Sequence, residues 1–236
     1  MDESVTPMKR LIKTAIAAST ASFVAAPAAA ELELSFYMGL QSVQDSTISG
    51  TLPGGAPVNR SVNWEGKPLE NPFYYGARGT WWTANNLGFG LELTHAKAYA
   101  DAASMAAIGV SRLELSDGHN IITANVMKRW PGAFAKTPKF TPYVGAGLGI
   151  AMPHVDVQPL AAGSVRTFGY ETTGPAARGI AGLKYNLNQD WALFGEYQVT
   201  WSDNDLTVDA PAGTANGKLS TDIVTHAVNF GVSYSF

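Results

Sequence analysis

Four histidines and the acidic residues near them are the part of this sequence most able to do chemistry, because the 236-residue chain has no cysteine. Asp117 stands two positions before His119, Asp156 stands two positions after His154, and His95 precedes both pairs. Imidazole and carboxylate ligands at an open site are the usual set for catalytic iron, copper or zinc. We therefore predict a transition metal bound by His95, His119 and His154 with Asp117 or Asp156. The alternative is that these histidines only hydrogen-bond with loop backbone, sugars or phosphates.

Strands must position these residues, because apolar side chains recur at every second position from residue 31 onward. Leu34 and Phe36, for example, alternate with Glu33 and Ser35. This period is typical of a strand with one apolar face. Eight segments follow the pattern, each about as long as the 9–11 residues that a tilted strand needs to cross a bilayer. They cover residues 32–41, 73–82, 87–94, 120–130, 144–152, 175–185, 191–201 and 224–236.

The connections between these segments alternate in length, which is the layout of a membrane barrel. The long ones cover residues 42–72, 99–119, 153–168 and 202–221, and the short ones 83–86, 131–139 and 186–190. Tryptophans and tyrosines gather near the short turns, as an interfacial girdle would. We predict an all-β fold: an eight-stranded antiparallel transmembrane up-and-down β-barrel with long extracellular loops, over residues 31–236. A soluble β-sandwich is the alternative, but its aromatic residues would not sort to one end.

The opposite face of each segment predicts the interior of this barrel. Gly145, Gly147 and Gly149 fall on it, and an eight-stranded barrel is only wide enough for side chains to fill. The charged residues on the same face are Arg78, Glu92, Arg129, Arg178 and Glu196. Because an unpaired charge there costs several kcal/mol, we expect a structural ionic network in the lumen, in preference to a catalytic or conducting one.

Residues 1–30 have the pattern of a secretory signal peptide. Positive charges are followed by a mostly apolar stretch and by small residues that end at Ala30, where we predict cleavage. Met8 is an alternative start, because Asp2 and Glu3 are unusual in such a segment. Removal of residues 1–30 takes away three of the 16 basic and two of the 19 acidic residues, which leaves a net charge of −4. We expect export through the periplasm to the bacterial outer membrane.

All four histidines map to the ends of strands that face the long loops, so the predicted metal would lie at the extracellular rim of the barrel. His95, His119 and His154 belong to neighbouring strands and could approach one another, whereas His226 shares a face with outward apolar residues. Lys97, Arg112 and Lys218 lie in the same outer zone and would suit lipopolysaccharide phosphates, although ordinary solvated charge explains them equally well. The chain is not strongly basic, which argues against nucleic acid, and it has no nucleotide or flavin motif.

Several stretches of the chain, loop segments included, resemble the outer-membrane lipid A oxidase family, which forms 2-aminogluconate and lies within the OmpA-like eight-stranded barrels. They are WEGKPLENPFYYGARGTWW (64–82), GFGLELTHAKAYA (88–100), LELSDGHNIITANVMKRWPG (113–132), TPYVGAGLGIAMPHVDV (141–157) and LFGEYQVTWS (193–202).

The resemblance implies oxygen-dependent oxidation of the proximal glucosamine of lipid A, at a C1 that carries no phosphate, with hydrogen peroxide as by-product. It implies that the partner is the lipid A of the outer leaflet. From the strand pattern we expect a membrane-embedded protein, and we expect a monomer. It brings no catalytic residue set, so the candidate catalytic residues stay His95, His119 and His154. Side chains alone do not activate oxygen, which is why the rim metal is part of this hypothesis. The alternative function is a non-enzymatic OmpA-like structural or adhesive barrel.

Overall fold

The computed structural model describes residues 31–134, 136–137 and 139–236, so the signal peptide predicted at 1–30 lies outside the described residues. These described residues form twelve strands and one short helix. They are β1 (Glu31–Val43), β2 (Ser46–Thr51), β3 (Pro57–Val62), β4 (Trp64–Glu65), β5 (Tyr75–Trp82), β6 (Leu87–Ala100), α2 (Ala102–Ile108), β7 (Val110–Arg129), β8 (Phe140–Pro159), β9 (Thr167–Tyr170), β10 (Gly174–Asn186), β11 (Trp191–Val208) and β12 (Gly217–Ser235). No helix in the described part of the chain is long and apolar enough to cross a membrane.

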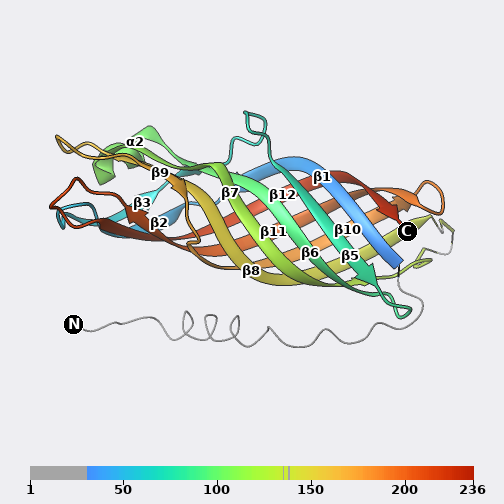
Figure 1. Cartoon of the computed structure of the whole chain (residues 1–236). Helices are drawn as coiled ribbons and strands as arrows, with labels where there is room; N and C mark the ends of the chain where they lie inside the picture. Colours follow the sequence, from blue (N-terminus) through green and yellow to red (C-terminus); the bar gives the residue numbers. More distant parts are fainter. Residues whose placement is uncertain (1–30, 135, 138) are drawn as a thin grey trace.

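Eight of the strands close into a ring. The order is β1-β5-β6-β7-β8-β10-β11-β12, and β12 returns to β1 through pairs such as Leu34 with Tyr234. Every pairing is antiparallel, and the strands run tilted along an elongated barrel (Figure 1). The predicted eight-stranded barrel is confirmed.

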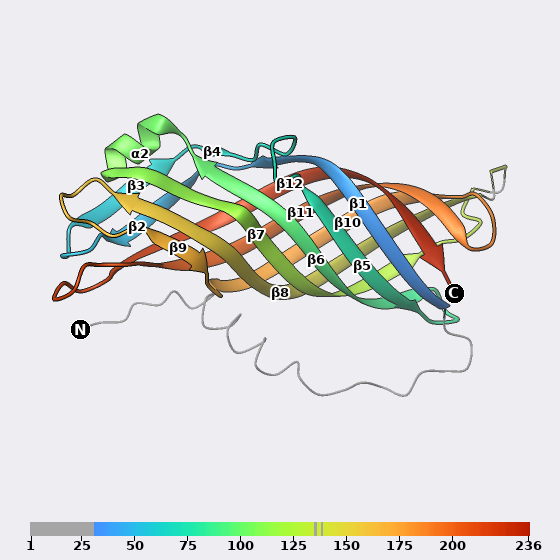
Figure 2. The same ribbon diagram turned by 45° about the horizontal axis from the view of Figure 1, so that its top comes forward.

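The predicted long loops are for the most part strand. β7 begins at Val110, β8 continues to Pro159, β11 continues to Val208, and the β2–β3 hairpin extends the wall beside β12. Figures 1 and 2 show β2, β3, β9 and α2 gathered at the end of the barrel opposite the C-terminus. The turns at the C-terminal end are short, so the extended end is the extracellular one.

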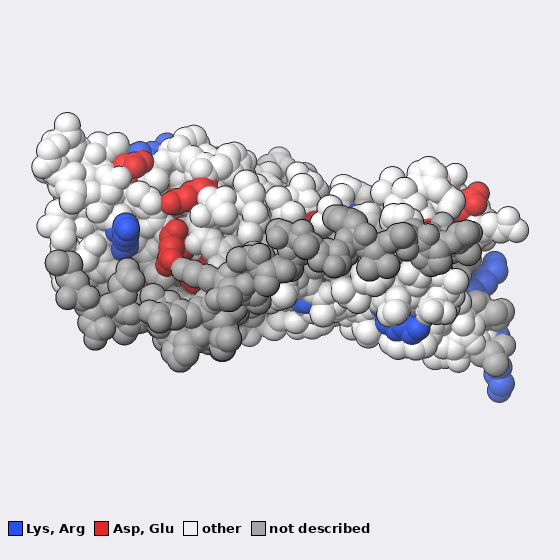
Figure 3. All heavy atoms as spheres, turned by 60° about the horizontal axis from the view of Figure 1, so that its bottom comes forward, with Lys and Arg blue, Asp and Glu red and all other residues white. Residues whose placement is uncertain are grey.

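A belt of exposed apolar side chains surrounds the part of the barrel near the short turns. On β6 the belt residues are Leu87, Phe89, Leu91 and Leu93, of which Leu91 is 67% exposed. On the face seen in Figure 3, acidic side chains predominate among the charged ones toward the extended end, and basic ones predominate at the short-turn end. We call the part that carries the belt the membrane half, and the part beyond it the outer half.

The interior of the outer half is a packed apolar core. Its wall strands present buried apolar residues inward, and α2 and the β2–β3 hairpin complete the packing. The core residues are Ile48, Val58, Val62, Trp64, Ala98, Ala100, Ile108, Val110, Leu113, Leu115, Val155, Val157, Leu206, Val208, Leu219 and Ile223.

Candidate functional site

The lumen of the membrane half is filled by the residues that the sequence predicted there. The Arg78 Nη2 atom lies 2.8 Å from Glu196 Oε2, and Arg178 Nη1 lies 2.9 Å from Glu92 Oε1. The Tyr37 hydroxyl donates to Glu92 at 2.6 Å. All five of these side chains are buried, so the charges are neutralised inside the barrel and not by solvent.

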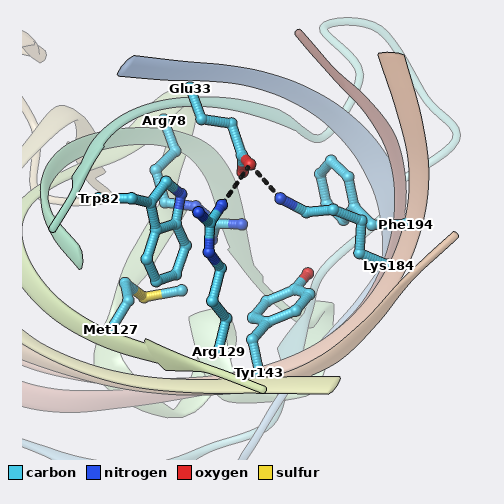
Figure 4. Close-up of a pocket in the computed structure, with 8 residues that line it drawn as sticks. All are labelled: Glu33, Arg78, Trp82, Met127, Arg129, Tyr143, Lys184 and Phe194. Carbon is cyan, nitrogen blue, oxygen red and sulfur yellow. Dashed lines mark hydrogen bonds and ion pairs between the residues drawn. The ribbon is translucent and has the colours of Figure 1, made fainter. Parts of the chain in front are cut away.

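A second layer of ion pairs lies closer to the short turns. Glu33 is placed between Lys184 and Arg129, as Figure 4 shows, and Arg129 also binds Glu31 at 2.6 Å. Between the two layers remains a cavity of about 10 Å³, which holds about one water molecule. The lumen therefore leaves no room for a substrate at this level.

His119 faces the interior, at the boundary between the polar lumen and the apolar core. Its Nε2 atom lies 2.9 Å from the Ser202 hydroxyl of β11, and the side chain is buried. Asn204 donates to the same hydroxyl at 3.0 Å. His119 is thus a packed interior histidine, 1% exposed.

His95 and His154 lie on the other side of the barrel wall. On β6, β7 and β8, the next outward position after the apolar belt is His95, Asn120 and His154, respectively. Asn120 pairs with His95 in the register of β6 and β7, and the Asn120 Oδ1 atom lies 3.0 Å from His95 Nδ1. The Tyr75 ring stacks on His95 with 5.0 Å between ring centroids.

A bulge in β7 brings Asp117 to the same outer face. The register between β7 and β8 shifts between Leu115 and His119, and Asp117 Oδ2 comes to lie 3.7 Å from His154 Nδ1. Gly118 in this bulge has a φ of 114°, and a Cβ there would lie 2.7 Å from the His95 ring. Glycine is therefore required at position 118, because any side chain there would collide with the His95 ring.

Tyr170 of β9 completes this group. It pairs with His154 in the register of β8 and β9, its ring lies edge-on to His154 at 4.8 Å, and its hydroxyl donates to the Asp117 carbonyl at 2.9 Å. We call the set His95, Asp117, Asn120, His154 and Tyr170 the outer-wall strip. Sequence reasoning missed Asn120 and Tyr170; the outward parity of β7 could have indicated Asn120, but Tyr170 depends on the β8–β9 pairing.

Two imidazole nitrogens in the strip are buried without a hydrogen-bond partner. They are His95 Nε2 and His154 Nδ1, and the two residues are 8% and 7% exposed. A buried nitrogen without a partner costs free energy, unless a ligand or water satisfies it. The strip therefore offers two unused donor or acceptor positions beside the Asp117 carboxylate.

Asp156 is engaged elsewhere. Arg166 donates to it twice, from Nε at 2.8 Å and from Nη2 at 2.6 Å, and Arg112 lies 3.3 Å away. Its two oxygens are thus held by guanidinium groups and do not turn toward His154. Arg112 also binds Glu114 at 3.3 Å, so neither arginine is a free cation.

The predicted three-histidine metal site does not fit this arrangement. The barrel wall separates His119 from His95 and His154, and the two arginines hold Asp156. Within residues 31–134, 136–137 and 139–236, no three His, Asp or Glu side chains are grouped closely enough to hold a metal ion. One face brings together only His95, His154 and Asp117.

Comparison with known proteins shows which family the fold belongs to. The family model described as the outer membrane protein beta-barrel domain matches residues 15–236. The crystal structure of the outer membrane protein OprG from Pseudomonas aeruginosa aligns with a TM-score of 0.54 at 14% identity, over 89% of this chain and 97% of that one. The solid-state NMR structure of the outer membrane protein AlkL aligns with a TM-score of 0.50 at 17% identity, over 92% and 96%. No curated protein sequence matches the chain.

At such low identities these structures show the fold alone. The family match covers the whole barrel, and the closed ring of strands with its exposed apolar belt agrees with it. The chain therefore belongs to the outer membrane protein beta-barrel domain family and is located in the bacterial outer membrane.

Proposed function

We propose that this protein is an outer-membrane oxidase that converts the proximal glucosamine of lipid A to 2-aminogluconate at the outer-wall strip. One observation carries the proposal: on three neighbouring strands, His95, Asn120 and His154 directly follow the apolar belt on the lipid-facing side. This is the level at which the sugar headgroup of an outer-leaflet glycolipid meets its acyl chains. The resemblance of the loop-side stretches to the lipid A oxidase family supplies the reaction.

We propose a site on the outer surface of the barrel wall because side chains fill the lumen. Ion pairs occupy the membrane half, and the apolar core around Leu113 and Leu115 occupies the outer half. A lipid that stays in its leaflet reaches the outer-wall strip by lateral diffusion. Its acyl chains would lie against belt residues such as Leu93 and Ile122.

The reaction at C1 is a two-electron oxidation. The C1 hemiacetal loses two hydrogens and becomes a lactone, oxygen takes up both hydrogens and electrons as hydrogen peroxide, and water opens the lactone to the acid. In this scheme the Asp117 carboxylate, whose side chain is 53% exposed, takes the one proton of the C1 hydroxyl and passes it to His154 Nδ1, 3.7 Å away, from which it goes to the peroxide. Asn120 orients the His95 ring beside them. A rim metal stays a prediction, and no step is assigned to it because the predicted ligands do not converge.

The charge around the strip favours a sugar without a C1 phosphate. Two arginines of the outer half, Arg112 and Arg166, are both bound to Asp156. Lys97 is fully buried and donates to the Glu70 carbonyl at 2.6 Å, so it is not available as a phosphate site. A phosphate at C1 would therefore meet the Asp117 carboxylate without a free counter-charge.

A non-enzymatic structural or adhesive barrel is the second candidate. The observation in its favour is the filled interior, because a barrel closed by ion pairs and an apolar core needs no ligand to be stable. Under this alternative the outer-wall strip only anchors the protein at the lipid headgroup level.

Mass spectrometry of lipid A tests the two candidates. The protein would be expressed in a Gram-negative host whose lipid A lacks the C1 phosphate, in air and without oxygen. We expect the proximal sugar to gain one oxygen atom in air only, and His154→Ala to abolish this gain. His226→Ala is the matched control, because His226 is also an outward histidine at the top of the belt, but on β12.

Unmodified lipid A with a folded wild-type barrel in the outer membrane would exclude the oxidase and leave the structural barrel. Equal loss of activity in His154→Ala and His226→Ala would move the site away from the strip.

A further inference from the structure

We infer that the exposed face of Tyr170 is a stacking surface for a pyranose ring of an outer-leaflet glycolipid. The inference rests on the proposed function for the identity of that lipid, namely lipid A. It adds a positioning residue and a binding mode to the site: an aromatic platform on the outer wall, beside the Asp117 carboxylate and the His154 ring.

Tyr170 is both exposed and held in place, which is unusual for a surface side chain. The residue is 63% exposed, yet its hydroxyl is fixed by the Asp117 carbonyl at 2.9 Å. The His154 ring meets it edge-on, with an angle of 80° between the rings. A ring fixed in this way loses little side-chain entropy when a ligand binds to its free face.

The neighbouring ring on β9 does not offer the same surface. Phe168 is 56% exposed, but the Arg166 guanidinium lies over its face at 4.3 Å from the centroid. Arg166 is in turn held by Asp156. Of the two aromatic rings beside His154, only Tyr170 has no cation assigned to its face in the described structure.

The chemistry around Tyr170 suits a neutral sugar better than a phosphate. An aromatic face packs well against the C–H face of a pyranose, and a carboxylate and an imidazole at its edge suit hydroxyl groups. His154 Nδ1 has no hydrogen-bond partner and lies 3.7 Å from Asp117 Oδ2. Because the nitrogen is buried, a sugar hydroxyl would meet the Asp117 carboxylate, whose side chain is 53% exposed.

The position of the ring along the wall points to a lipid as the carrier of this sugar. Tyr170 pairs with His154, and the preceding outward residues of β8, Leu148, Ile150 and Met152, belong to the apolar belt. A glycolipid with its sugar on Tyr170 would therefore place its acyl chains along β8. A free oligosaccharide would gain nothing from the belt.

Binding of purified lipid A tests the inference without any need for catalysis. The barrel would be held in a detergent without a sugar headgroup, and lipid A lacking the C1 phosphate would be titrated and counted by native mass spectrometry. We expect Tyr170→Leu, which keeps apolar bulk but removes the ring, to weaken binding about tenfold, as expected for the loss of one aromatic contact. Tyr170→Phe, which keeps the ring, should stay within about twofold of wild type.

Tyr197→Leu is the matched control. Tyr197 is also an outward tyrosine, 45% exposed, whose ring stacks beside a histidine, but it lies on β11 away from the strip. Its loss should leave lipid A binding unchanged, and phosphatidylglycerol should bind all variants equally. Wild-type affinity in Tyr170→Leu, or an equal loss in Tyr197→Leu, would overturn the inference.

The outcomes separate this inference from the proposed function. A wild-type protein that binds lipid A through Tyr170 but never oxidises it would retain the inference and reject the oxidase. An active oxidase whose Tyr170→Leu variant keeps the wild-type KM and affinity would retain the function and reject the stacking surface.

Discussion

The interior of the barrel is charged in the membrane half and apolar in the outer half. In the membrane half the lumen holds Arg78, Glu92, Arg178 and Glu196, whereas in the outer half it holds residues such as Leu115. The outside changes in the opposite sense, from the apolar belt to polar and charged side chains. The long strands β6, β7, β8, β11 and β12 run through both regions, so one strand has its apolar face outward in the membrane half and inward in the outer half.

The two halves therefore obtain their stability in different ways. Burial of apolar area stabilises the outer half at about 25 cal/mol per Å², as in a soluble protein. In the membrane half the outer surface faces lipid, so burial of apolar area there adds no comparable stabilisation. Every backbone N–H and C=O group must instead be paired within the closed ring of strands, because lipid offers no hydrogen-bond partner. The buried ion pairs of the membrane half contribute little net stability, but breaking one of them is expensive.

The largest effect should follow from the loss of a buried charge in the membrane half. Glu92→Gln leaves Arg178, and in part Arg78, without its counter-charge, and weakens the bond from Tyr37. We expect a loss of about 3–5 kcal/mol in the free energy of unfolding, because the remaining guanidinium stays buried. Urea unfolding in lipid vesicles, followed by the heat-dependent gel shift of the barrel, would measure it.

Glu65→Gln is the control for this change. Glu65 forms an ion pair with Lys67 at 3.1 Å, but both side chains are substantially exposed. Its loss should cost at most about 1 kcal/mol. If the two variants were equally stable, the lumen would be hydrated well enough to solvate the arginines, and the contrast between the two halves would disappear.

A truncation in the outer half should have a somewhat smaller and more local effect. Leu115→Ala removes a fully buried side chain from the apolar core, which typically costs about 2–5 kcal/mol. The outer half should open while the membrane half stays closed. Protease cleavage of the outer hairpins in vesicles should therefore accelerate, with no change in the heat-dependent gel shift.

Leu160→Ala provides the comparison within the same half. Leu160 is 62% exposed, so its truncation should change stability by less than about 0.5 kcal/mol. Loss of the closed membrane half in Leu115→Ala would mean that the two halves unfold as one unit.

The change of the apolar face between the two halves also explains which parts of the fold could be predicted from the sequence. The membrane half was predictable because outward apolar residues such as Leu193 and Val199 mark each strand. Beyond the belt the outward positions of β11 become Asp203 and Asp205, while Leu206 turns inward. Apolar residues still recur at every second position, but they now face the interior of the barrel. A prediction that follows outward apolar residues therefore ends the strand at this point.

The candidate site was predictable only in part for a related reason. His95 and His154 lie on the same outer face, on the two strands that flank β7, but both strands continue beyond them and the histidines are not at strand ends. The sequence does not reveal the β-bulge before His119, which turns Asp117 outward while His119 faces inward. A bulge of this kind changes which face a side chain reaches, and nothing in the alternation marks it.

The inward glycines provide a third contrast, between the two sides of the wall. A Cβ at Gly149 would overlap the Ile122 carbonyl, whereas a Cβ at the outward Gly79 would meet only the Leu34 side chain, at 3.5 Å. Gly149→Ala should therefore cost about 1–3 kcal/mol through forced separation of β7 and β8, and Gly79→Ala should be nearly neutral. The same urea titration measures both, and equal values would mean that the wall can move apart freely.

The smallest effect concerns α2, which caps the outer half. Asp101 accepts a hydrogen bond from the Ser104 backbone N–H at 2.7 Å at the start of this helix. The Ser104 hydroxyl and backbone N–H lower the pKa of the Asp101 carboxyl below its usual value. A lowered pKa means that the contribution of the cap is complete above the unfolded pKa of about 3.9, and is lost as pH falls through the lower folded value.

Hydrogen exchange of the α2 amides at a series of pH values measures this loss. Protection relative to the intrinsic rate should be constant above about pH 5 and decline in more acid solution, while the membrane half keeps its protection. Asp101→Asn still caps the helix but does not titrate, so its profile should be flat over the same range. A decline of the same size in Asp101→Asn would assign the acid sensitivity to other carboxylates of the outer half. In that case the Asp101 cap would not limit the stability of this half.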